Sequence, residues 1–432
     1  MKNKNLIQIT VLSVVIVFLS SCSKNKSSVD PIPVVDCAGI ENGIAAEDDC
    51  GTCHKSYMYS GMGNLTTVDT YADTTGLDGM FILAGSPSDI ANNPLWRTSV
   101  TPPTYAFNFE GNSTVSYSGQ AGRLATAKAL YDALNDNVTV DRTALDLIID
   151  NTNSKLFTKT AENDQSNDYD RSTVMTHINT ILDTYCANSA AFEAGTAATA
   201  GTAGMAGNYQ LDARGWEADQ QFAKMLIGAL CLEQVSYDYL TKMDVDNSDR
   251  TYSTGNNYTK REHYYDEAYG YVYGLDDNDL DAAINNGLLL GKYLNKHDSG
   301  NDNSGVDYRQ RVYDAFKMGR QAVVDECPAE LNRQITEINN CLSKVVAWHA
   351  QDYLKSAALA IGTNSFFHDV SEAWGFVYSL QFTKVDGVAI FTANEVMGMI
   401  ATLDAGESGA YSLDAPTLNN MATTINNAVT FD

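Results

Sequence analysis

The sequence predicts a mainly α-helical protein, a helical bundle with an internally duplicated helical unit. Three observations support this prediction. From Gln120 onward, apolar residues recur three and four positions apart, which is the spacing that lines one face of a helix. One such pattern continues from Pro328 to about Ile361. Two segments, which begin at His263 and His368, repeat each other and so indicate related helical units.

The composition excludes nucleic acid as a partner. The chain has 432 residues with 54 acidic against 28 basic side chains, a formal charge of −26. A surface this acidic is repelled by DNA, by RNA and by anionic lipid headgroups. The 44% of hydrophobic residues still suffice for a sizeable core, so we expect one large or two modest globular units.

The N-terminus predicts export and lipid anchoring. Two lysines precede an apolar run, which is the pattern of a secretion signal. The segment Leu19–Cys22 (LSSC) then resembles the lipobox of bacterial lipoproteins, in which the chain is cleaved before the cysteine and that cysteine is lipidated. We therefore expect residues 1–21 to be a signal peptide and Cys22 to hold the protein at the membrane. The alternative, a transmembrane anchor, needs about 20 apolar residues.

A flexible tether (residues 22–35) and a Cys/Asp-rich stalk (residues 36–64) are expected to follow. Within the stalk, Cys50, Cys53 and His54 form the CxxCH pattern that attaches c-type haem. The stalk also resembles small Cys-and-Asp repeats of secreted bacterial proteins, in which the cysteines pair with each other. Because the stalk is polar and has few apolar residues to enclose a porphyrin, we favour disulfides and keep haem c as the alternative.

The cysteines after the lipidated one are odd in number, so at least one sulfur has no disulfide partner within the chain. Cys327 and Cys341 lie on one predicted helix, and at about 1.5 Å per residue they are about 20 Å apart. This distance is too long for a bridge, so we expect their partners on other elements. The seven cysteines are Cys37, Cys50, Cys53, Cys186, Cys231, Cys327 and Cys341.

Residues 65–118 show no helical period and are expected to be irregular, with a few short strands such as Gly79–Leu83. Residues 119–432 form the predicted helical domain, with repeat units around residues 215–275 and 337–380.

Local signals mark several helices of this domain. Pro328 suits the first turn of the long helix and Gly362 suits its end. Asp414 precedes a final helix. The Ala-, Gly- and Thr-rich segment 190–207 is too flexible for an ordinary helix, and it forms either a close backbone contact or a mobile loop beside a cleft. Apolar stripes mark two further helices through Val174, Ile178, Ile181 and Tyr185, and through Val312, Phe316, Arg320 and Val323.

Each copy of the repeat places a glutamate four residues after a histidine, so on a helix the two side chains share a face. If the two helix faces meet, their imidazole nitrogens and carboxylate oxygens form a ligand site for Fe²⁺, Mn²⁺ or Zn²⁺. We favour the alternative that each glutamate accepts a hydrogen bond from its own histidine, while Gly270 and Gly375 let helices cross closely. The candidate ligands are His263 and Glu267 in the first copy and His368 and Glu372 in the second.

Four stretches of the chain resemble the lipoprotein family called domain-of-unknown-function 4856. The resemblance covers most of the chain after about residue 95. It implies a helical lipoprotein of the outer membrane or periplasm, associated with imelysin-like proteins and iron uptake in Gram-negative bacteria, and it implies no established activity. The imelysin motif GxHxxE is absent, because His368 is followed by glutamate at the fourth place. The resembling stretches are residues 105–124, 214–240, 263–274 and 368–380.

Three functional hypotheses follow. The first is a lipid-anchored outer-membrane protein, facing the periplasm or the cell surface, that assists iron or other metal acquisition without catalysis and has an uptake receptor as its partner. The second is a c-type haem electron-transfer lipoprotein that uses Cys50, Cys53 and His54. The third is a metal-dependent envelope hydrolase with Glu267 as its base, although the chain lacks GxSxG, HExxH, P-loop and GxGxxG motifs.

Overall fold

The chain forms two compact units, an N-terminal unit (residues 1–46 and 53–89) and a C-terminal unit (residues 47–52 and 90–432). The predicted signal peptide and the lipidated Cys22 lie outside the described residues. No helix within the described ranges is long and apolar enough to cross a membrane. The computed structural model describes residues 34–48, 50–59, 65–84, 101–152, 154–163, 169–275, 289–297 and 306–431.

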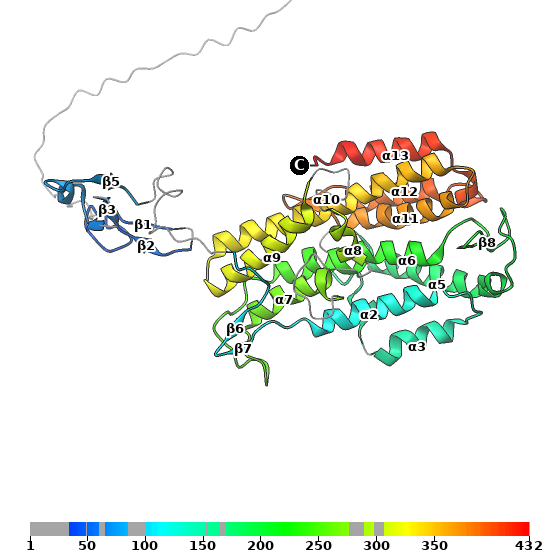
Figure 1. The fold of residues 1–432 in the computed structure, drawn as a ribbon, viewed down its shortest axis with the longest axis horizontal. Coiled ribbons are helices and arrows are strands. Elements are labelled where there is room, and N and C mark those ends of the chain that lie inside the picture. The colour runs from blue at the N-terminus through cyan, green and yellow to red at the C-terminus, as the bar shows by residue number, and fades with distance from the viewer. Residues whose placement is uncertain are drawn as a thin grey trace, which may run out of the picture. The chain divides into compact units, whose positions relative to one another are not determined.

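The N-terminal unit is built on a three-stranded antiparallel sheet in the order β4-β3-β5 (Figure 1). Side chains alternate between the two faces of a strand, and Met58 of β3 packs with Ile44 and Val68 in a small core. Strand β5 confirms the short strand predicted at residues 79–83. The elements within residues 34–84 are β1 (Ala46–Glu47), β2 (Cys53–His54), β3 (Ser56–Tyr59), β4 (Leu65–Val68), the 3-10 helix η1 (Tyr71–Thr74) and β5 (Met80–Ile82).

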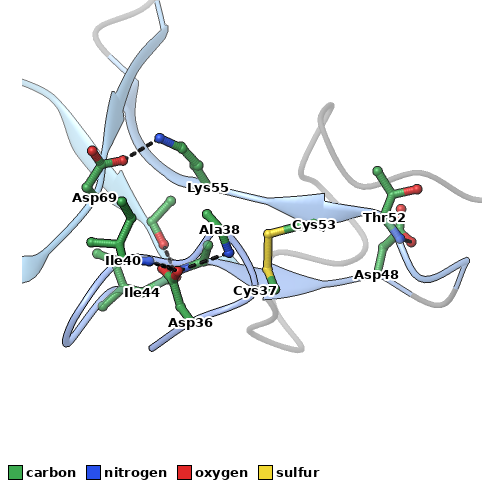
Figure 2. Close-up of a disulfide and its surroundings, with 12 residues drawn as sticks. Asp36, Cys37, Ala38, Ile40, Ile44, Asp48, Thr52, Cys53, Lys55 and Asp69 are labelled. Carbon is green, nitrogen blue, oxygen red and sulfur yellow. Dashed lines mark hydrogen bonds and ion pairs between the residues drawn. A yellow bond between two sulfur atoms is a disulfide. The ribbon is translucent and has the colours of Figure 1, made fainter. Parts of the chain in front are cut away.

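A disulfide between Cys37 and Cys53 closes a loop in this unit (Figure 2). Asp36 organises the same loop, because its carboxylate accepts the backbone N–H groups of Ile40 at 2.9 Å and of Ala45 at 2.8 Å. These hydrogen bonds lower the pKa of Asp36 below its usual value. Cys37, through its disulfide, and Asp36, through these hydrogen bonds, thus both stabilise the loop.

The C-terminal unit is a bundle of helices that lie side by side (Figure 1), which confirms the mainly α fold. Short hairpins join some of them. The helices are α2 (Ser118–Ala133), α3 (Arg142–Thr152), α4 (Leu156–Lys159), α5 (Arg171–Glu193), α6 (Ala218–Leu226), α7 (Lys260–Tyr273), α8 (Leu289–Asn295), α9 (Tyr308–Val324), α10 (Pro328–Ala360), α11 (Ser365–Ser379), α12 (Ala393–Leu403) and α13 (Ala415–Ala428). The hairpins are β6 (Asn108–Phe109) with β7 (Asn112–Ser113), β8 (Gly204–Ala206) with β9 (Tyr209–Leu211), and β10 (Lys384–Val385) with β11 (Val388–Ala389).

Helix α10 has 33 residues and packs against α9, α11 and α13. Pro328 occupies its first turn, where no intrahelical N–H bond is needed. Gly362 follows its end with φ +86°, a left-handed conformation that glycine adopts without strain. Both predicted boundaries of this helix are therefore confirmed.

The two predicted apolar stripes lie in α5 and α9, and all their residues are buried, Arg320 included. The final helix α13 begins after Asp414, whose side chain accepts the Thr417 N–H. In the segment 190–207, α5 continues to Glu193 and the chain then forms a loop and strand β8. Helix therefore extends further into this segment than its composition indicates.

The helix that starts as α6 widens after Leu226 into two π-helices, η3 (Ile227–Leu232) and η4 (Gln234–Asp238), and ends in the 3-10 helix η5 (Tyr239–Thr241). Gly228 lies against α11, where an added Cβ would be 2.6 Å from the Cα of Ser379. The backbone N–H of Gly228 donates to Ser379 Oγ at 2.9 Å. Nothing in the local sequence pattern reveals this change of helical pitch.

The two copies of the repeat form α7 and α11, and each uses its glycine to approach another helix. A Cβ on Gly270 would lie 2.5 Å from the Cβ of Tyr117, the residue before α2. A Cβ on Gly375 would lie 2.5 Å from the Cβ of Lys224 in α6. The predicted close crossings are confirmed, and the two copies pack on different partner helices.

Candidate functional site

In the first repeat, His263 and Glu267 face each other but do not form a hydrogen bond. His263 Nε2 is 3.8 Å from Glu267 Oε2, and the imidazole stacks on the ring of Tyr258 with centroids 4.4 Å apart. Glu267 accepts a hydrogen bond from Gln120 Nε2 of α2 at 2.8 Å. The carboxylate is thus held by a neighbouring helix.

In the second repeat, His368 Nε2 is likewise 3.8 Å from Glu372 Oε2. His368 Nδ1 lies 2.7 Å from Glu217 Oε2. Glu372 contacts Lys224 Nζ at 2.8 Å and accepts a hydrogen bond from the Tyr293 hydroxyl at 2.9 Å. Although burial opposes its ionisation, the Lys224 ammonium lowers the pKa of Glu372 to about 2.

The structure does not bring these four side chains together. The first pair lies against α2 and the second against α6, and the carboxylates already have protein partners. Among the described residues, no group of three or more histidine, cysteine, aspartate or glutamate side chains could hold a metal ion. The predicted site of His263, Glu267, His368 and Glu372 is therefore not formed, and neither is the direct hydrogen bond within each pair.

Both cysteines of the CxxCH pattern are engaged in disulfides. Cys53 is bonded to Cys37, and Cys50 is bonded to Cys327 at the start of α10. A thioether to haem needs a free sulfur, so neither residue can attach haem in this structure. The expectation of a disulfide partner on another element is confirmed for Cys327 and is wrong for Cys341, which is a free cysteine.

A pocket of about 420 Å³ lies in the C-terminal unit. One face of α5 provides a wall, because residues from His177 to Asn188 recur there at helical spacing. The chain around β9 and the start of α6 provides the opposite side, and α11 and the end of α12 complete it. The lining residues are His177, Thr180, Ile181, Thr184, Tyr185, Asn188, Phe192, Gln210, Asp212, Ala213, Arg214, Trp216, Ala218, Gln221, Trp374 and Asp404.

The charged groups of the pocket bind one another and the backbone. Asp212 accepts the N–H groups of Arg214 at 2.8 Å and of Trp216 at 2.9 Å, which closes the turn after β9. The Arg214 guanidinium donates to the carbonyl oxygen of Asp404 at 2.7 Å. Trp374 Nε1 donates to the Asp404 carboxylate at 3.3 Å. Burial raises the pKa of both Asp212 and Asp404.

His177 is held neutral at the edge of the pocket. Its Nδ1 lies 2.9 Å from the hydroxyl of Tyr378. Burial lowers the pKa of His177, so the uncharged imidazole predominates at neutral pH.

Two buried polar atoms of lining residues have no hydrogen-bond partner among the described residues. They are the amide oxygen of Gln210, which is 6% exposed, and the indole nitrogen of Trp216, which is 4% exposed. A buried polar atom left unpaired costs about 1–3 kcal/mol, so such atoms are normally satisfied by water or by a ligand. Because water reaches neither atom, neither one offers a donor or an acceptor to the open space of the pocket, and a Cβ on Gly409 would lie 3.1 Å from Trp216 Nε1.

The sequence could not reveal this pocket, because its residues come from four separate segments. In the sequence, histidines were considered only as candidate ligands of a metal or of haem. His177 has no metal-ligating residue near it in the sequence and was therefore not a candidate. The one local signal was the small-residue segment 190–207, for which a loop beside a cleft was one alternative. The pocket lies between the helix that enters this segment and the strand that follows it.

Comparison with known proteins identifies the family. The sequence profile of the family described as domain of unknown function (DUF4856) matches residues 102–432. No curated protein and no solved structure matches the chain. The matched range contains α2–α13 and the whole lining of the pocket. Because the match spans more than half of the sequence, the chain belongs to the DUF4856 family.

Proposed function

We propose that the protein is a lipid-anchored binding protein of the cell envelope, and that its ligand is a small organic molecule held in the α5/α6/α11 pocket. The observation that supports binding is a pocket of about 420 Å³ whose lining combines aromatic side chains with polar ones such as Thr184 and Asn188. Pockets that bind small molecules have volumes of about 300–1,000 Å³ and combine aromatic walls with a few placed polar groups. This pocket has both properties.

An organic ligand fits the geometry better than a metal ion does. The carboxylates of Glu267 and Glu372 are bound to neighbouring helices, and the two histidines lie in different surroundings. Iron or other metal acquisition, and with it an uptake receptor as partner, is therefore not part of the proposal. The hydrolase alternative also loses support, because Glu267 is bound to Gln120.

The anchor and the outer-membrane location rest on the LSSC segment that ends at Cys22. Replacement Cys22→Ala is expected to abolish labelling by a fatty acid and to release the protein from the membrane fraction. The matched control Cys186→Ala replaces a free cysteine of α5, and it should change neither the fatty-acid labelling nor the membrane association. A Cys22→Ala protein that remains labelled and membrane-bound would contradict the anchor.

Binding is tested by native mass spectrometry of the full lipoprotein isolated from its own envelope in mild detergent. The wild type is expected to carry an additional organic mass that is released on denaturation. Thr184→Trp fills the pocket from α5 and should abolish that mass. Thr423→Trp introduces the same bulk on an exposed position of α13 and should retain it. A ligand that survives Thr184→Trp, or wild-type protein without any ligand, overturns the proposal.

A further inference from the structure

We infer that a second pocket of the bundle, beside α2, binds a phosphate group, either as free phosphate or at the end of a small phosphomonoester. This pocket has a volume of about 550 Å³. It shares no lining residue with the pocket between α5, α6 and α11, so the inference goes beyond the proposed function. One side of it is a face of α2, and another is the chain that enters α4. The lining residues are Ser118, Gly119, Gly122, Arg123, Ala125, Thr126, Ala129, Ser154 and Lys155.

The pocket contains a buried cation without a carboxylate partner. Arg123 is only 8% exposed, and buried arginines are normally paired with an acid. The buried Arg320, for example, has its Nε 2.9 Å from the Asp266 carboxylate. Arg123 forms no ion pair with any described residue, and its hydrogen bond runs from Nη1 to the Tyr271 hydroxyl at 3.2 Å. The counter-charge that this guanidinium needs therefore comes from outside the described chain.

The free end of the Arg123 guanidinium reaches the open space of the pocket. Its Nε is closed off from solvent, but Nη2, which also has no hydrogen-bond partner among the described residues, is not. Both terminal nitrogens lie beside Gly119, at 3.6 and 3.7 Å from the position that a Cβ would take there. Gly119 lines the pocket and has no side chain to cover them. The bond to Tyr271, whose ring centroid lies 5.9 Å from the guanidinium carbon, holds the group in place before an anion binds.

Further groups of the lining attract an anion. Helix α2 begins at the pocket, and its N-cap residue Tyr117 makes no side-chain capping bond. The backbone N–H groups of Ser118 and Gly119 have no acceptor in the part of the chain that the structure describes. Such free N–H groups, together with the positive end of the helix dipole, favour negative charge. Lys155 adds a second cation, which is exposed and has no ion pair with a described residue.

The charge of the lining favours phosphate over other ligand groups. The described lining contains no aspartate or glutamate, although the chain has 54 acidic residues. A neutral or cationic ligand would leave Arg123 without a counter-charge. A carboxylate brings one negative charge, whereas a phosphate monoester carries about −1.5 to −2 at neutral pH and matches Arg123 and Lys155 together. A guanidinium also donates to two oxygens of one phosphate, and the volume leaves room for an attached organic group.

Isothermal titration calorimetry of the full chain in mild detergent tests the site. The probes are inorganic phosphate and glycerol 3-phosphate, with acetate as a singly charged anion and choline as a cation. At least one phosphate compound is expected to bind with a dissociation constant below about 1 mM, more tightly than acetate, while choline does not bind. If inorganic phosphate binds more tightly, free phosphate is the ligand. If glycerol 3-phosphate binds more tightly, the phosphate is carried by an organic group.

Substitutions then locate the binding. Arg123→Gln removes the buried cation and should weaken phosphate binding by about tenfold or more, the effect of a lost hydrogen bond to a charged group. Gly122→Leu fills the pocket from an exposed position of α2, where a Cβ would meet no atom within 4 Å, and should abolish binding while the fold is kept. Lys155→Gln should weaken binding by up to about fivefold. Lys128→Gln removes a charge of α2 outside the pocket and is the matched control with unchanged affinity.

Three results overturn the inference. The first is wild-type protein that binds neither phosphate compound with a dissociation constant below about 1 mM. The second is acetate that binds as tightly as phosphate, and the third is unaltered affinity in Arg123→Gln or Gly122→Leu. If circular dichroism shows that Arg123→Gln does not fold, Gly122→Leu decides alone. None of these results bears on the proposed function, because Thr184→Trp, which tests it, changes no residue of this site.

Discussion

At the scale of single residues, the second repeat contains a chain of buried charges. Lys224, which is 1% exposed, binds Glu372, and His368 lies between Glu372 and Glu217. Asp219 lies nearby, and burial raises its pKa to about 7. Charges removed from water need close partners, so the repeat uses its histidine and glutamate to join α11 to α6.

The buried pair of Lys224 and Glu372 gives the first prediction. Lys224→Met leaves the Glu372 carboxylate buried without its cation, and the free energy of unfolding in urea is expected to fall by about 3–5 kcal/mol. The double replacement Lys224→Met with Glu372→Leu removes both charges and should recover most of that loss. Lys128→Met breaks an exposed pair with Asp132 and should cost less than about 1 kcal/mol. Equal losses for Lys224→Met and Lys128→Met would contradict the account.

His368 gives a prediction about pH. Burial opposes its positive charge, but contact with Glu217 raises the pKa of His368 above 6.5. Its contribution to stability is therefore complete below about pH 6.5 and is lost as the pH rises through the raised folded pKa. The difference in unfolding free energy between wild type and His368→Gln is therefore expected to shrink as the pH rises above about 6.5.

A second histidine serves as the control for this pH dependence, because its shift has the opposite sign. Burial lowers the pKa of His177, so its neutral form is favoured in the folded state and wild type gains stability relative to His177→Gln as the pH rises towards 6.5. Parallel curves for wild type and His368→Gln over the whole range would show that Glu217 does not stabilise the imidazolium.

At the scale of elements, glycine decides where helices cross. A Cβ on Gly375 of α11 would lie 2.5 Å from Lys224 Cβ and 3.0 Å from the backbone oxygen of Gln221. Gly398 of α12 is exposed and has no atom within 4 Å of such a Cβ. Replacement of glycine by alanine should therefore lower the stability of the protein at position 375 and raise it at position 398.

Thermal and urea unfolding can measure these effects. Gly375→Ala is expected to destabilise the protein by about 1–3 kcal/mol, because the two helices must move apart. Gly398→Ala should stabilise it by about 0.5–1 kcal/mol, because alanine loses less conformational freedom in a helix. A stabilising Gly375→Ala would show that α11 does not pack on α6 as described.

The elements that could be predicted from the sequence are those whose boundaries and buried faces depend on residues close together in the chain. The boundaries of α10 follow from Pro328 and Gly362, and the buried face of α5 follows from the spacing of its apolar residues. The first π-helix after Leu226 contacts α11 through Gly228 and Ser379, which are far apart in the sequence. A local pattern contains no information about that contact.

The candidate site likewise depends on contacts between distant residues, which a local sequence pattern does not reveal. The repeat correctly indicated two related helices, but it did not reveal that α7 packs on α2 whereas α11 packs on α6. Similar sequences therefore gave two histidine–glutamate pairs in different surroundings. The pocket lies between elements that share no motif, and its lining residues come together only once the chain is folded.

At the scale of the whole molecule, a disulfide links residues that are 277 positions apart, Cys50 and Cys327. Closing so long a loop restricts the unfolded chain, and in the chain-entropy treatment this stabilises the fold by about 5–6 kcal/mol. The linkage also assigns the CxxCH cysteines to disulfide formation. It predicts a defined pattern of bridges in the folded protein.

Digestion without reduction, followed by mass spectrometry, tests this pattern. The expected bridged peptides contain Cys37 with Cys53 and Cys50 with Cys327, and the thiols of Cys186, Cys231 and Cys341 should react with an alkylating agent after denaturation. Replacement Cys327→Ser should leave the first bridge intact. A peptide with a Cys50–Cys53 bond, or one that carries haem on these residues, would contradict the assignment.

The central claim is that this DUF4856 protein holds a small organic ligand between α5, α6 and α11. The most direct test is a crystal structure of the protein isolated from the cells that naturally produce it, compared with Thr184→Trp treated in the same way. The account predicts density for an organic molecule in the wild-type pocket, in contact with Thr184, and none in the variant. A ligand bound elsewhere, or a wild-type pocket that contains only water, would contradict it.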